Sequence, residues 1–311
     1  MFKKIDDVGE RSMKKIVLLG SLNMDLVITS PYMPKEGETI KGDSFMSTPG
    51  GKGANQAVAA ARAGGKVSMC GCLGEDVFGS ELKNSLLSSG VDCSFLRTDS
   101  QQSTGIAIII VVDGDNRIIL DSGANARLTR ADVDDALSEA GPGDIFLSQL
   151  EVPHDIVDYG LKKAKGKGLT TLLNPAPAHL QCVQSFEYVD ILIPNESELE
   201  ILGKSSDFDT AVKNVQAAGV KKLIVTLGSK GSVLIEGAER HYIDSYKVKA
   251  VDTTAAGDTF CGYLAAGISK GVAITDAMQI ASAAAALSVT AAGAQKSIPC
   301  YNSVMEFVGK E

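Results

Sequence analysis

Short apolar runs rich in Val, Ile and Leu recur along the whole chain and are separated by stretches with helical periodicity. The runs are KKIVLLG at 14–20, VSMCGCLG at 67–74, DIFLSQL at 144–150, TTLLNPAP at 170–177, VDILIPN at 189–195 and KLIVTLG at 222–228. Strands of a parallel sheet are apolar throughout, because helices cover both faces of the sheet. The sequence therefore predicts an α/β fold with a doubly wound, mainly parallel sheet flanked by helices.

Most of these runs pass into polar residues where they end. In open α/β sheets, ligands bind beyond the carboxyl ends of the strands, along one edge of the sheet. A single polar strand end is usually only a turn, whereas several that end alike indicate a binding site. The polar residues expected along this edge are Asn23, Asp25, Glu151, Asn174, Asn195, Glu198 and Thr226.

Two segments, 26–45 and 105–123, do not follow the alternation of strand and helix. The first lacks helical periodicity and carries prolines and glycines. The second contains two apolar stretches around DGDN, which is a strong hairpin signal. We expect both to belong to a small β-sheet that stands off the main domain as a lid or a dimer contact, over about 26–48 and 104–122.

The composition bounds the partners and the compartment. The formal net charge is −8 and no basic run exceeds two residues, which argues against nucleic acid or an anionic membrane as a partner. No stretch approaches the ~20 apolar residues of a membrane span. The six cysteines show no CxxC pair and no zinc spacing, as is typical of buried apolar residues in a reducing compartment. We expect a cytoplasmic protein with a disordered tail over 1–12 and one domain over 13–311.

The glycine-rich segment GGKGANQ at 50–56 fits neither of two common phosphate-binding motifs. It lacks the first glycine of the P-loop and the Ser or Thr after the lysine, and Gln56 stands where the dinucleotide motif needs its third glycine. A tight turn before the following helix would explain one or two of the glycines. Three glycines around a lysine favour backbone lying flat against a polar ligand, with Lys52 and Asn55 as hydrogen-bond donors.

Two further segments at strand ends admit a structural or a binding interpretation. In PNESE at 194–198, Asn195 and Glu198 have the spacing of a capping box, and their side chains could instead organise a hydrated Mg²⁺. TLGSKGS at 226–232 fits a hairpin turn, and it also stands where a nucleotide could lie across a strand end. The residues alone leave both alternatives open.

The segment VDTTAAGDTFCG at 251–262 carries the strongest indication of chemistry. The small residues Ala255, Ala256 and Gly257 at a helix start present free amides to an anion. Asp258 lies in the first turn, where the helix dipole favours an ionised carboxylate. A helix cap accounts less naturally for both features together. We therefore interpret the segment as an anion hole beside a general base for phosphoryl transfer.

Eight motifs, taken in order, resemble those of the ribokinase family of sugar kinases, which also includes the B-type phosphofructokinases and adenosine kinases. They are GSLNMD, GGKGANQAVAAA, STGIA, NPAPA, PNESE, TLGSKG, DTTAAGDTF and GAQKSIP, and the resemblance spans residues 14 to about 308. GGKGAN together with DTTAAGDTF is specific, whereas each shorter motif alone is weak.

This resemblance implies a doubly wound domain with a β lid that also forms a homodimer contact. It implies ATP-dependent phosphorylation of the 5-hydroxyl of D-ribose, with Mg²⁺ and with K⁺ as a monovalent activator. Two alternatives stay open: a kinase of the same family for another sugar or a nucleoside, and a catalytically inactive sugar-binding regulator. The low aromatic content argues against a nucleoside, and the intact Asp258 argues against a regulator.

The resemblance also implies a role for each site residue, with Asp258 as the base and Ala255, Ala256 and Gly257 as the anion hole. The sugar would contact Asn23, Asp25, Gly51, Lys52, Asn55, Ala107, Glu151 and Asp258. The nucleotide and its hydrated Mg²⁺ would contact Asn195, Glu198, Thr226, Leu227, Gly228, Ser229, Lys230, Gly231 and Gly257. The K⁺ site would comprise Asp252, Thr254, Ser288, Ala291, Gly293 and Ser297, mostly through main-chain oxygens.

Two positions depart from the family pattern. Lys296 stands in GAQKSIP where proline is more usual, so its ammonium is expected to weaken the K⁺ dependence. Ala281 and Ser282 stand where family members often place a His or Asn near adenine, which leaves only small residues at that contact.

Overall fold

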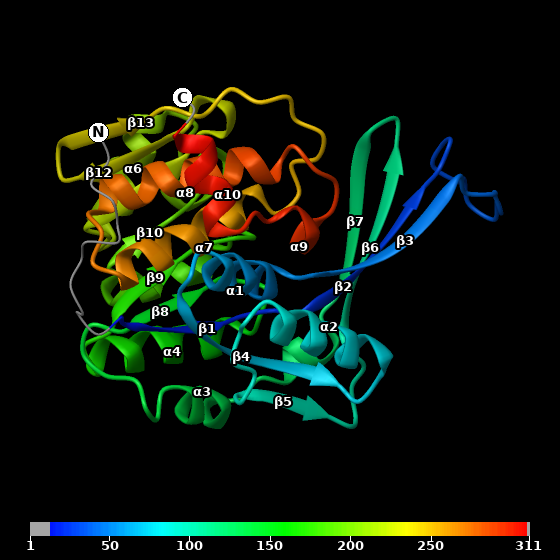
Figure 1. Cartoon of the computed structure of the whole chain (residues 1–311), viewed down its shortest axis with the longest axis horizontal. Coiled ribbons are helices and arrows are strands. Elements are labelled where there is room, and N and C mark those ends of the chain that lie inside the picture. Colours follow the sequence, from blue (N-terminus) through cyan, green and yellow to red (C-terminus); the bar gives the residue numbers. More distant parts are fainter. Residues whose placement is uncertain (1–12, 310–311) are drawn as a thin grey trace.

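The computed structural model describes residues 13–309, and the tail predicted at 1–12 lies outside the described residues. The larger of two sheets has nine strands (Figure 1). From one edge to the other they are β13 (Glu239–Ile243), β12 (Ser232–Glu236), β11 (Lys222–Thr226), β10 (Ile191–Leu192), β9 (Thr170–Leu173), β8 (Ile145–Ser148), β1 (Lys15–Leu19), β4 (Lys66–Gly74) and β5 (Leu96–Asp99). Only the β11–β12 and β12–β13 pairs are antiparallel, so the mainly parallel sheet is confirmed.

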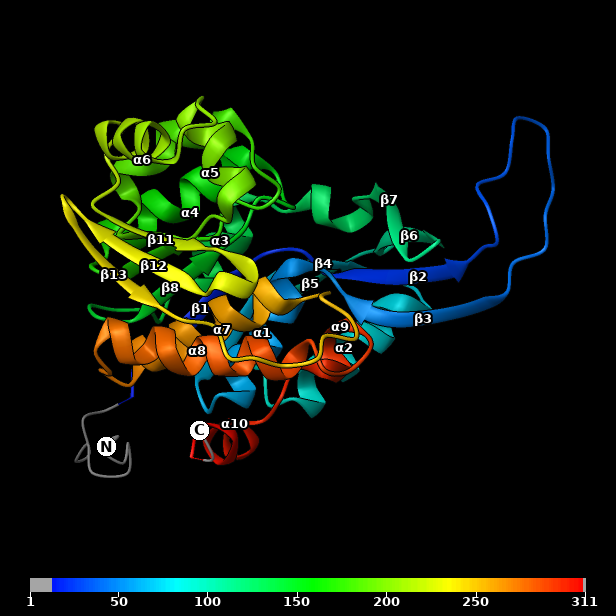
Figure 2. The ribbon, with the colours of Figure 1, turned by 90° about the horizontal axis from the view of Figure 1, so that it is seen from above.

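Helices cover both faces of this sheet (Figure 2). One face packs against α1 (Lys52–Arg62), α2 (Val77–Ser88), α7 (Ala256–Ser269), α8 (Ile274–Ser288) and α10 (Tyr301–Val308). The other packs against α3 (Arg130–Ala136), α4 (His154–Gly166), η3 (Leu180–Tyr188), α5 (Glu196–Gly203) and α6 (Phe208–Ala217). Successive strand residues point to opposite faces, so Ile16 of β1 joins the first core and Val17 joins the second. This double cover explains why the central strands are apolar throughout.

A separate four-stranded sheet stands beside the main body, in the order β3-β2-β6-β7 (Figure 1). Its strands are β2 (Asn23–Thr29), β3 (Ser44–Gly50), β6 (Gly105–Val112) and β7 (Asp115–Asp121). The predicted hairpin is confirmed: β6 and β7 pair antiparallel around Asp113 and Gly114. Both turn residues have positive φ, 52° and 83°, as a tight hairpin turn requires.

The outer part of this small sheet is apolar on both of its faces. Cross-strand neighbours such as Ile108 and Ile119, at 38 % and 61 % exposure, lie on one face. Ile118, at 56 % exposure, points to the opposite face because it is next to Ile119 in the strand. Further exposed apolar side chains of this sheet are those of Ile28, Phe45, Met46 and Leu120. The outer part of the small sheet therefore leaves several large apolar side chains exposed on each face.

Helices α1 and α7 approach each other closely at Gly262. A Cβ atom at this position would lie 2.5 Å from the Ala59 Cβ and 2.5 Å from the main-chain oxygen of Gln56, so only glycine fits. Asp258 stands one turn earlier on α7. The contact therefore brings the start of α7 against the start of α1.

Among residues 13–309, no helix is long and apolar enough to span a membrane. All six cysteines are free thiols. Five are buried as expected, but the expectation is wrong for Cys300, which is exposed because it precedes α10 at the surface.

Candidate active site

Polar residues that follow three different strands lie at the carboxyl edge of the main sheet, and one of them contacts the main chain just after a fourth strand. Ser21 follows β1, and its Oγ donates to Oε2 of Glu151, which lies beyond β8, at 2.6 Å. Asn174 follows β9, and its Nδ2 donates to the main-chain oxygen of Ile193, just after β10, at 2.8 Å. The strand ends that were expected to share one edge do so.

Asp258 is a buried carboxylate in the first turn of α7, with 7 % of its surface exposed. Its two oxygens accept hydrogen bonds from consecutive residues of α1. Asn55 Nδ2 donates to Oδ2 and Gln56 Nε2 donates to Oδ1, each at 3.0 Å. The residue before the helix, Ala255, has φ 60°, which is strained for a residue with a Cβ atom. The surrounding structure therefore holds the start of α7 in an unfavourable conformation.

The amides predicted to form an anion hole differ in their surroundings. The N–H of Ala256 donates to the main-chain oxygen of Thr253 at 3.3 Å, so it is partly engaged in a turn. Gly257 is exposed, and a Cβ atom there would meet nothing within 4 Å. Because the first-turn N–H groups of a helix have no acceptor within it, the Gly257 amide is not paired by the helix.

A cavity of about 550 Å³ lies beside the start of α7. Of the residues predicted to bind nucleotide, it is lined by Asn195, Thr226, Gly228, Ser229, Gly231 and Gly257. Leu227 instead packs against the core, and the Lys230 ammonium lies 3.7 Å from the Glu196 carboxylate at the surface. Ser282 lines the cavity, whereas Ala281 is fully buried.

The sequence analysis missed one side of this cavity. Residues 245–248 and Ala250 also line it, together with Phe260. No motif marks the 245–250 segment, because only the tertiary packing brings it against α8, whose end also lines the cavity.

The PNESE segment forms the predicted capping box. Asn195 Oδ1 accepts from the Glu198 amide and Glu198 Oε2 accepts from the Asn195 amide, each at 2.8 Å. Burial raises the pKa of Glu198, while the Asn195 amide and the Lys52 ammonium oppose that rise. Asn195 also lines the large cavity. Asn195 and Glu198 therefore form the complete capping box. Asn195 borders the cavity as well.

The loop 226–231 also forms the hairpin turn that was one of its two interpretations. It joins the antiparallel strands β11 and β12 through η4 (Gly228–Lys230). Gly228 and Gly231 have positive φ, 57° and 100°. The loop thus serves as a turn and as one wall of the cavity.

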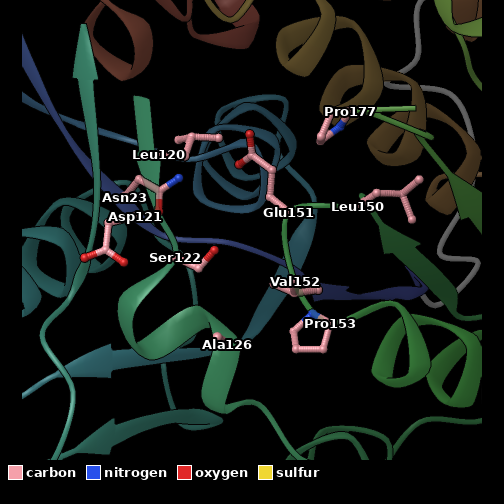
Figure 3. Close-up of a pocket in the computed structure, with 10 residues that line it drawn as sticks. All are labelled: Asn23, Leu120, Asp121, Ser122, Ala126, Leu150, Glu151, Val152, Pro153 and Pro177. Atoms are coloured by element: carbon pink, nitrogen blue, oxygen red, sulfur yellow. The ribbon is translucent and has the colours of Figure 1, made fainter. Parts of the chain in front are cut away.

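A second cavity, of about 300 Å³, lies between the main sheet and the small sheet (Figure 3). Figure 3 shows Asn23 and Leu120 on one side, Leu150 and Pro177 on the other, and Glu151 between them. Of the residues predicted to contact sugar, only Asn23 and Glu151 line this cavity. The residues Leu120, Asp121 and Ser122 at the end of β7 were missed, because the hairpin signal did not show which face meets the domain.

Glu151 is held in place from two sides. Its Oε2 accepts from Ser21 Oγ at 2.6 Å and from the Lys52 amide at 3.1 Å. Burial lowers the pKa of the Lys52 side chain, but the negative charges of Asp258, Glu151 and Glu198 outweigh burial and raise it. The Lys52 ammonium is therefore a fixed positive charge among carboxylates.

Asp25 is a buried carboxylate that lies against the backbone of Gly50. A Cβ atom at Gly50 would sit 2.2 Å from Asp25 Oδ2, so a glycine is required there. In register, Asp25 lies opposite Ala107, which is also buried. Burial, and then the charges of Glu151 and Asp258, raise the pKa of Asp25 to about 7. Within residues 13–309 no donor lies at hydrogen-bonding distance from this carboxylate, so its oxygens are available to a ligand.

Asn23 and Gly51 lie side by side at the junction of the two sheets. Gly51 has φ 85°, and a Cβ atom there would lie 2.6 Å from the Asn23 amide nitrogen. Asn125, which the sequence analysis missed, is 1 % exposed in η2 (Gly123–Arg127). Its Nδ2 donates to Asn23 Oδ1 at 2.8 Å. With its oxygen engaged, the Asn23 amide presents its N–H₂ group to the cavity as a donor.

The two loops predicted to hold K⁺ are joined by Asp252. Its Oδ1 accepts from the Thr254 amide and its Oδ2 accepts from the Gly293 amide, each at 2.9 Å. Burial alone would raise the pKa of Asp252, but these hydrogen bonds lower it. Ser288 and Ala291 share a turn, since the Ala291 amide donates to the Ser288 oxygen at 3.4 Å.

The remaining members of the predicted cation site lie in or beside α9 (Ala294–Ser297). Ser297 is buried and its Oγ donates to the Ala294 oxygen at 2.9 Å, whereas Lys296 is exposed. No group of three or more His, Cys, Asp or Glu side chains within residues 13–309 could hold a metal ion. The donors present are one carboxylate and main-chain carbonyls, which suit a hard cation rather than a transition metal.

Fold and cavities together define the class as an α/β protein that binds small molecules at the carboxyl edge of its sheet. The family is more specific. Residues 13–300 match the pfkB family carbohydrate kinases, and the chain belongs to that family.

Individual relatives agree with this assignment. The chain is 40 % identical over 301 residues to the ribokinase of Haemophilus influenzae, covering 95 % of this chain and 98 % of that one. It is 36 % identical over 300 residues to the deoxyribokinase of Salmonella typhimurium, covering 94 % and 98 %. The solved structure of Arabidopsis thaliana ribokinase complexed with ribose and ATP superposes with a TM-score of 0.86 at 32 % identity, covering 95 % and 98 %.

The raised pKa of Asp25 predicts a pH-dependent stability. The folded protein holds a proton on Asp25 up to about pH 7, whereas the unfolded chain releases it near the ordinary carboxyl value. The free energy of unfolding therefore falls as the pH rises between these values, and the loss is complete above about pH 7. Asp25→Asn removes this titration. Relative to wild type, the free energy of unfolding of the variant should rise by about 1–3 kcal/mol between about pH 5 and pH 8.

The measurement is urea denaturation of the sugar-free protein at both pH values. Asp43→Asn is the matched control, since it removes an exposed carboxylate. A stability difference between Asp25→Asn and wild type that stays the same at both pH values would contradict the raised pKa.

Proposed function

We propose that this carbohydrate kinase transfers the γ-phosphoryl group of ATP to the 5-hydroxyl of D-ribose. The relatives support the sugar and the nucleotide, since one is a ribokinase and one solved ribokinase is complexed with ribose and ATP. The observation that carries the proposal is the position of Asp258. It follows Gly257, which lines the large cavity, and its charge acts on Asp25 at the sugar end.

In this proposal Asp258 accepts the proton of the attacking hydroxyl. The hydroxyl oxygen then bonds to the γ-phosphorus, the bond to the β–γ bridging oxygen breaks, and ADP leaves with the electron pair. The amide of Gly257, with those of Ala255 and Ala256, stabilises the charge on the transferred group. The hydrogen bonds from Asn55 and Gln56 hold the Asp258 carboxylate in place for this proton transfer.

The residues at the sugar end supply both hydrogen-bond donors and hydrogen-bond acceptors. Asn23 offers the N–H₂ group that Asn125 leaves free, and Asp25 offers carboxylate oxygens without a donor of their own. Glu151 and Lys52, fixed against each other through the Lys52 amide, add an acceptor and a positive charge. Sugar hydroxyls can donate to the carboxylates and accept from Asn23 and Lys52.

Mg²⁺ and the nucleotide fit the residues around the large cavity. Asn195 and Glu198 would hold a hydrated Mg²⁺ through its waters, since Mg²⁺ keeps several of them. When bound, the ion neutralises charge on the phosphate oxygens. Thr226, Gly228, Ser229 and Gly231 would border the nucleotide, and the 245–250 segment would cover its other side.

The proposed function is tested by ADP release across D-ribose, deoxyribose, other sugars and a nucleoside. We expect the highest kcat/KM with D-ribose. In the same assay, Asp258→Asn should lower kcat by ~10²–10⁴-fold, because asparagine keeps the size of the side chain but cannot take the proton. Ribose binding, measured by calorimetry, should persist in this variant.

Asp276→Asn is the matched control, since Asp276 is an exposed acid in the first turn of α8. Turnover of Asp258→Asn within about threefold of wild type would reject the base assignment. A higher kcat/KM with deoxyribose than with D-ribose would show that deoxyribose is the preferred substrate. Binding without ADP release for any sugar would indicate an inactive regulator.

We also propose K⁺ as an activator held at the loops joined by Asp252. An ion there fixes the peptide segment that leads into Ala255 and Gly257, so it acts on the position of the amides. Turnover should rise severalfold as K⁺ replaces tetramethylammonium at constant ionic strength, and much less with Na⁺. Lys296→Gln should lower the K⁺ concentration needed for half activation, because it removes a competing positive charge. A response that is flat in K⁺ would show that the loops hold no activating ion.

The small sheet is proposed to act as a lid over the 300 Å³ cavity and as the contact of a homodimer. Its end at Leu120 lines that cavity, and its outer part is apolar and exposed on both faces. We expect wild type to sediment as a dimer and Ile119→Asp to sediment as a monomer, because a buried unpaired charge opposes association. Ile201→Asp, at a half-exposed position on α5, should stay dimeric. A monomeric wild type would reject the contact.

A further inference from the structure

Gln56 is a buried residue of α1 with 0 % exposure that contacts the Asp258 carboxylate directly. Its Nε2 donates to Asp258 Oδ1 at 3.0 Å and also to Asn174 Oδ1 at 3.0 Å. No phosphate-binding motif accounts for a glutamine at this position. The side chain nevertheless occupies the centre of the polar contacts around Asp258.

The orientation of the Gln56 amide is set by its acceptors Asp258 and Asn174, and a further neighbour, Gln149, is also 0 % exposed. Gln149 Nε2 donates to Gln56 Oε1 at 2.6 Å. A flipped Gln56 amide would bring its oxygen to 3.0 Å from the Asp258 carboxylate and its N–H₂ group against that of Gln149. Both contacts would be repulsive, so only the observed orientation satisfies the partners.

Asn174 supports the same orientation from β9. Its Nδ2 donates to the Ile193 oxygen at 2.8 Å, so its Oδ1 is turned toward Gln56 as an acceptor. The chain of amides thus runs from the ends of β8 and β9 through Gln56 to Asp258. The rigid sheet therefore determines where the carboxylate on α7 points.

Such a contact matters for a carboxylate that must take a proton. Each oxygen of Asp258 accepts one amide hydrogen bond, from Asn55 or from Gln56, and keeps a second lone pair free for a substrate hydroxyl. The position of the accepting carboxylate also affects the rate, because a displacement of about 1 Å can lower the rate by ~10²-fold.

We propose that Gln56 is a positioning residue for the base: it orients the Asp258 carboxylate, and Gln149 acts on the reaction only through Gln56. The inference rests on the proposed function, since it takes Asp258 as the base. It assigns no direct contact with substrate to either glutamine.

The test uses Gln56→Met and Gln149→Met, because methionine keeps the length of the side chain and removes the amide. Gln56→Met should lower kcat about 10–100-fold and leave KM for sugar and ATP within about threefold. Gln149→Met should act in the same direction and by less.

The double variant separates positioning from independent structural effects. If Gln149 acts only through Gln56, the Gln56→Met/Gln149→Met variant has the kcat of Gln56→Met alone. Multiplied losses in kcat would overturn that part of the proposal. Thr171→Val is the matched control: Thr171 is a fully buried, hydrogen-bonded residue of β9 at the opposite end of the strand, and its loss should lower Tm but leave kcat within about threefold of wild type.

Asp258→Asn in the same assay keeps the two proposals distinguishable. If Asp258→Asn keeps its turnover, the proposed base is wrong and Gln56 has nothing to position. If Asp258→Asn is inactive while Gln56→Met is folded and retains kcat within about threefold, only the positioning role is overturned.

Discussion

The contact between α1 and α7 at Gly262 is the constraint on which the rest of the site depends. Because no Cβ atom fits there, the two helices touch through backbone and Ala59. One turn earlier this contact places Asn55 and Gln56 at 3.0 Å from the Asp258 oxygens. The carboxylate is thus held by a helix that begins at the glycine-rich segment and by another that begins at a strained alanine. A wider spacing of the helices would leave a buried, unpaired charge, at a cost of several kcal/mol.

That carboxylate is one of several in a small volume. Asp25, Glu151 and Glu198 share its surroundings, and Lys52 is the cation that acts on all of them. Burial raises the pKa of Asp25 to about 7, and the nearby charges of Glu151 and Asp258 add to that rise. A site of this kind repels an anionic nucleotide unless positive partners oppose the repulsion. The helix start at Gly257, Lys52 and any bound cation supply that opposition, which explains how an acidic protein handles phosphate groups.

The fold and the strand ends of the site could be predicted from the sequence because both depend on local pattern. Continuous apolar runs specify a covered parallel sheet, and a DGDN turn specifies a hairpin. What the sequence analysis missed depends on tertiary packing. Gln56 was noted only because it stands where the dinucleotide motif needs a glycine. Its role could not be predicted, since its partner Gln149 lies 93 residues away. Likewise, nothing in the local sequence shows that Leu120 lines a cavity. Nor does it show that Gly231 lines the large cavity while the neighbouring Lys230 side chain lies at the surface.

Asn125 couples the small sheet to the sugar end of the site. The chain first enters this sheet after Leu22, returns to the main domain between β3 and β6, and finally leaves the sheet at the end of β7, just before η2. Asn125 joins the first and the last of these crossings: its Oδ1 accepts from the Leu22 amide at 2.9 Å, and its Nδ2 donates to the Leu22 and Asn23 oxygens at 3.0 and 2.8 Å. The small sheet therefore cannot rotate at this junction without breaking a buried hydrogen bond or carrying Asn23 with it. Since breaking one costs about 1–3 kcal/mol, movement of the sheet and orientation of the Asn23 donor are energetically linked.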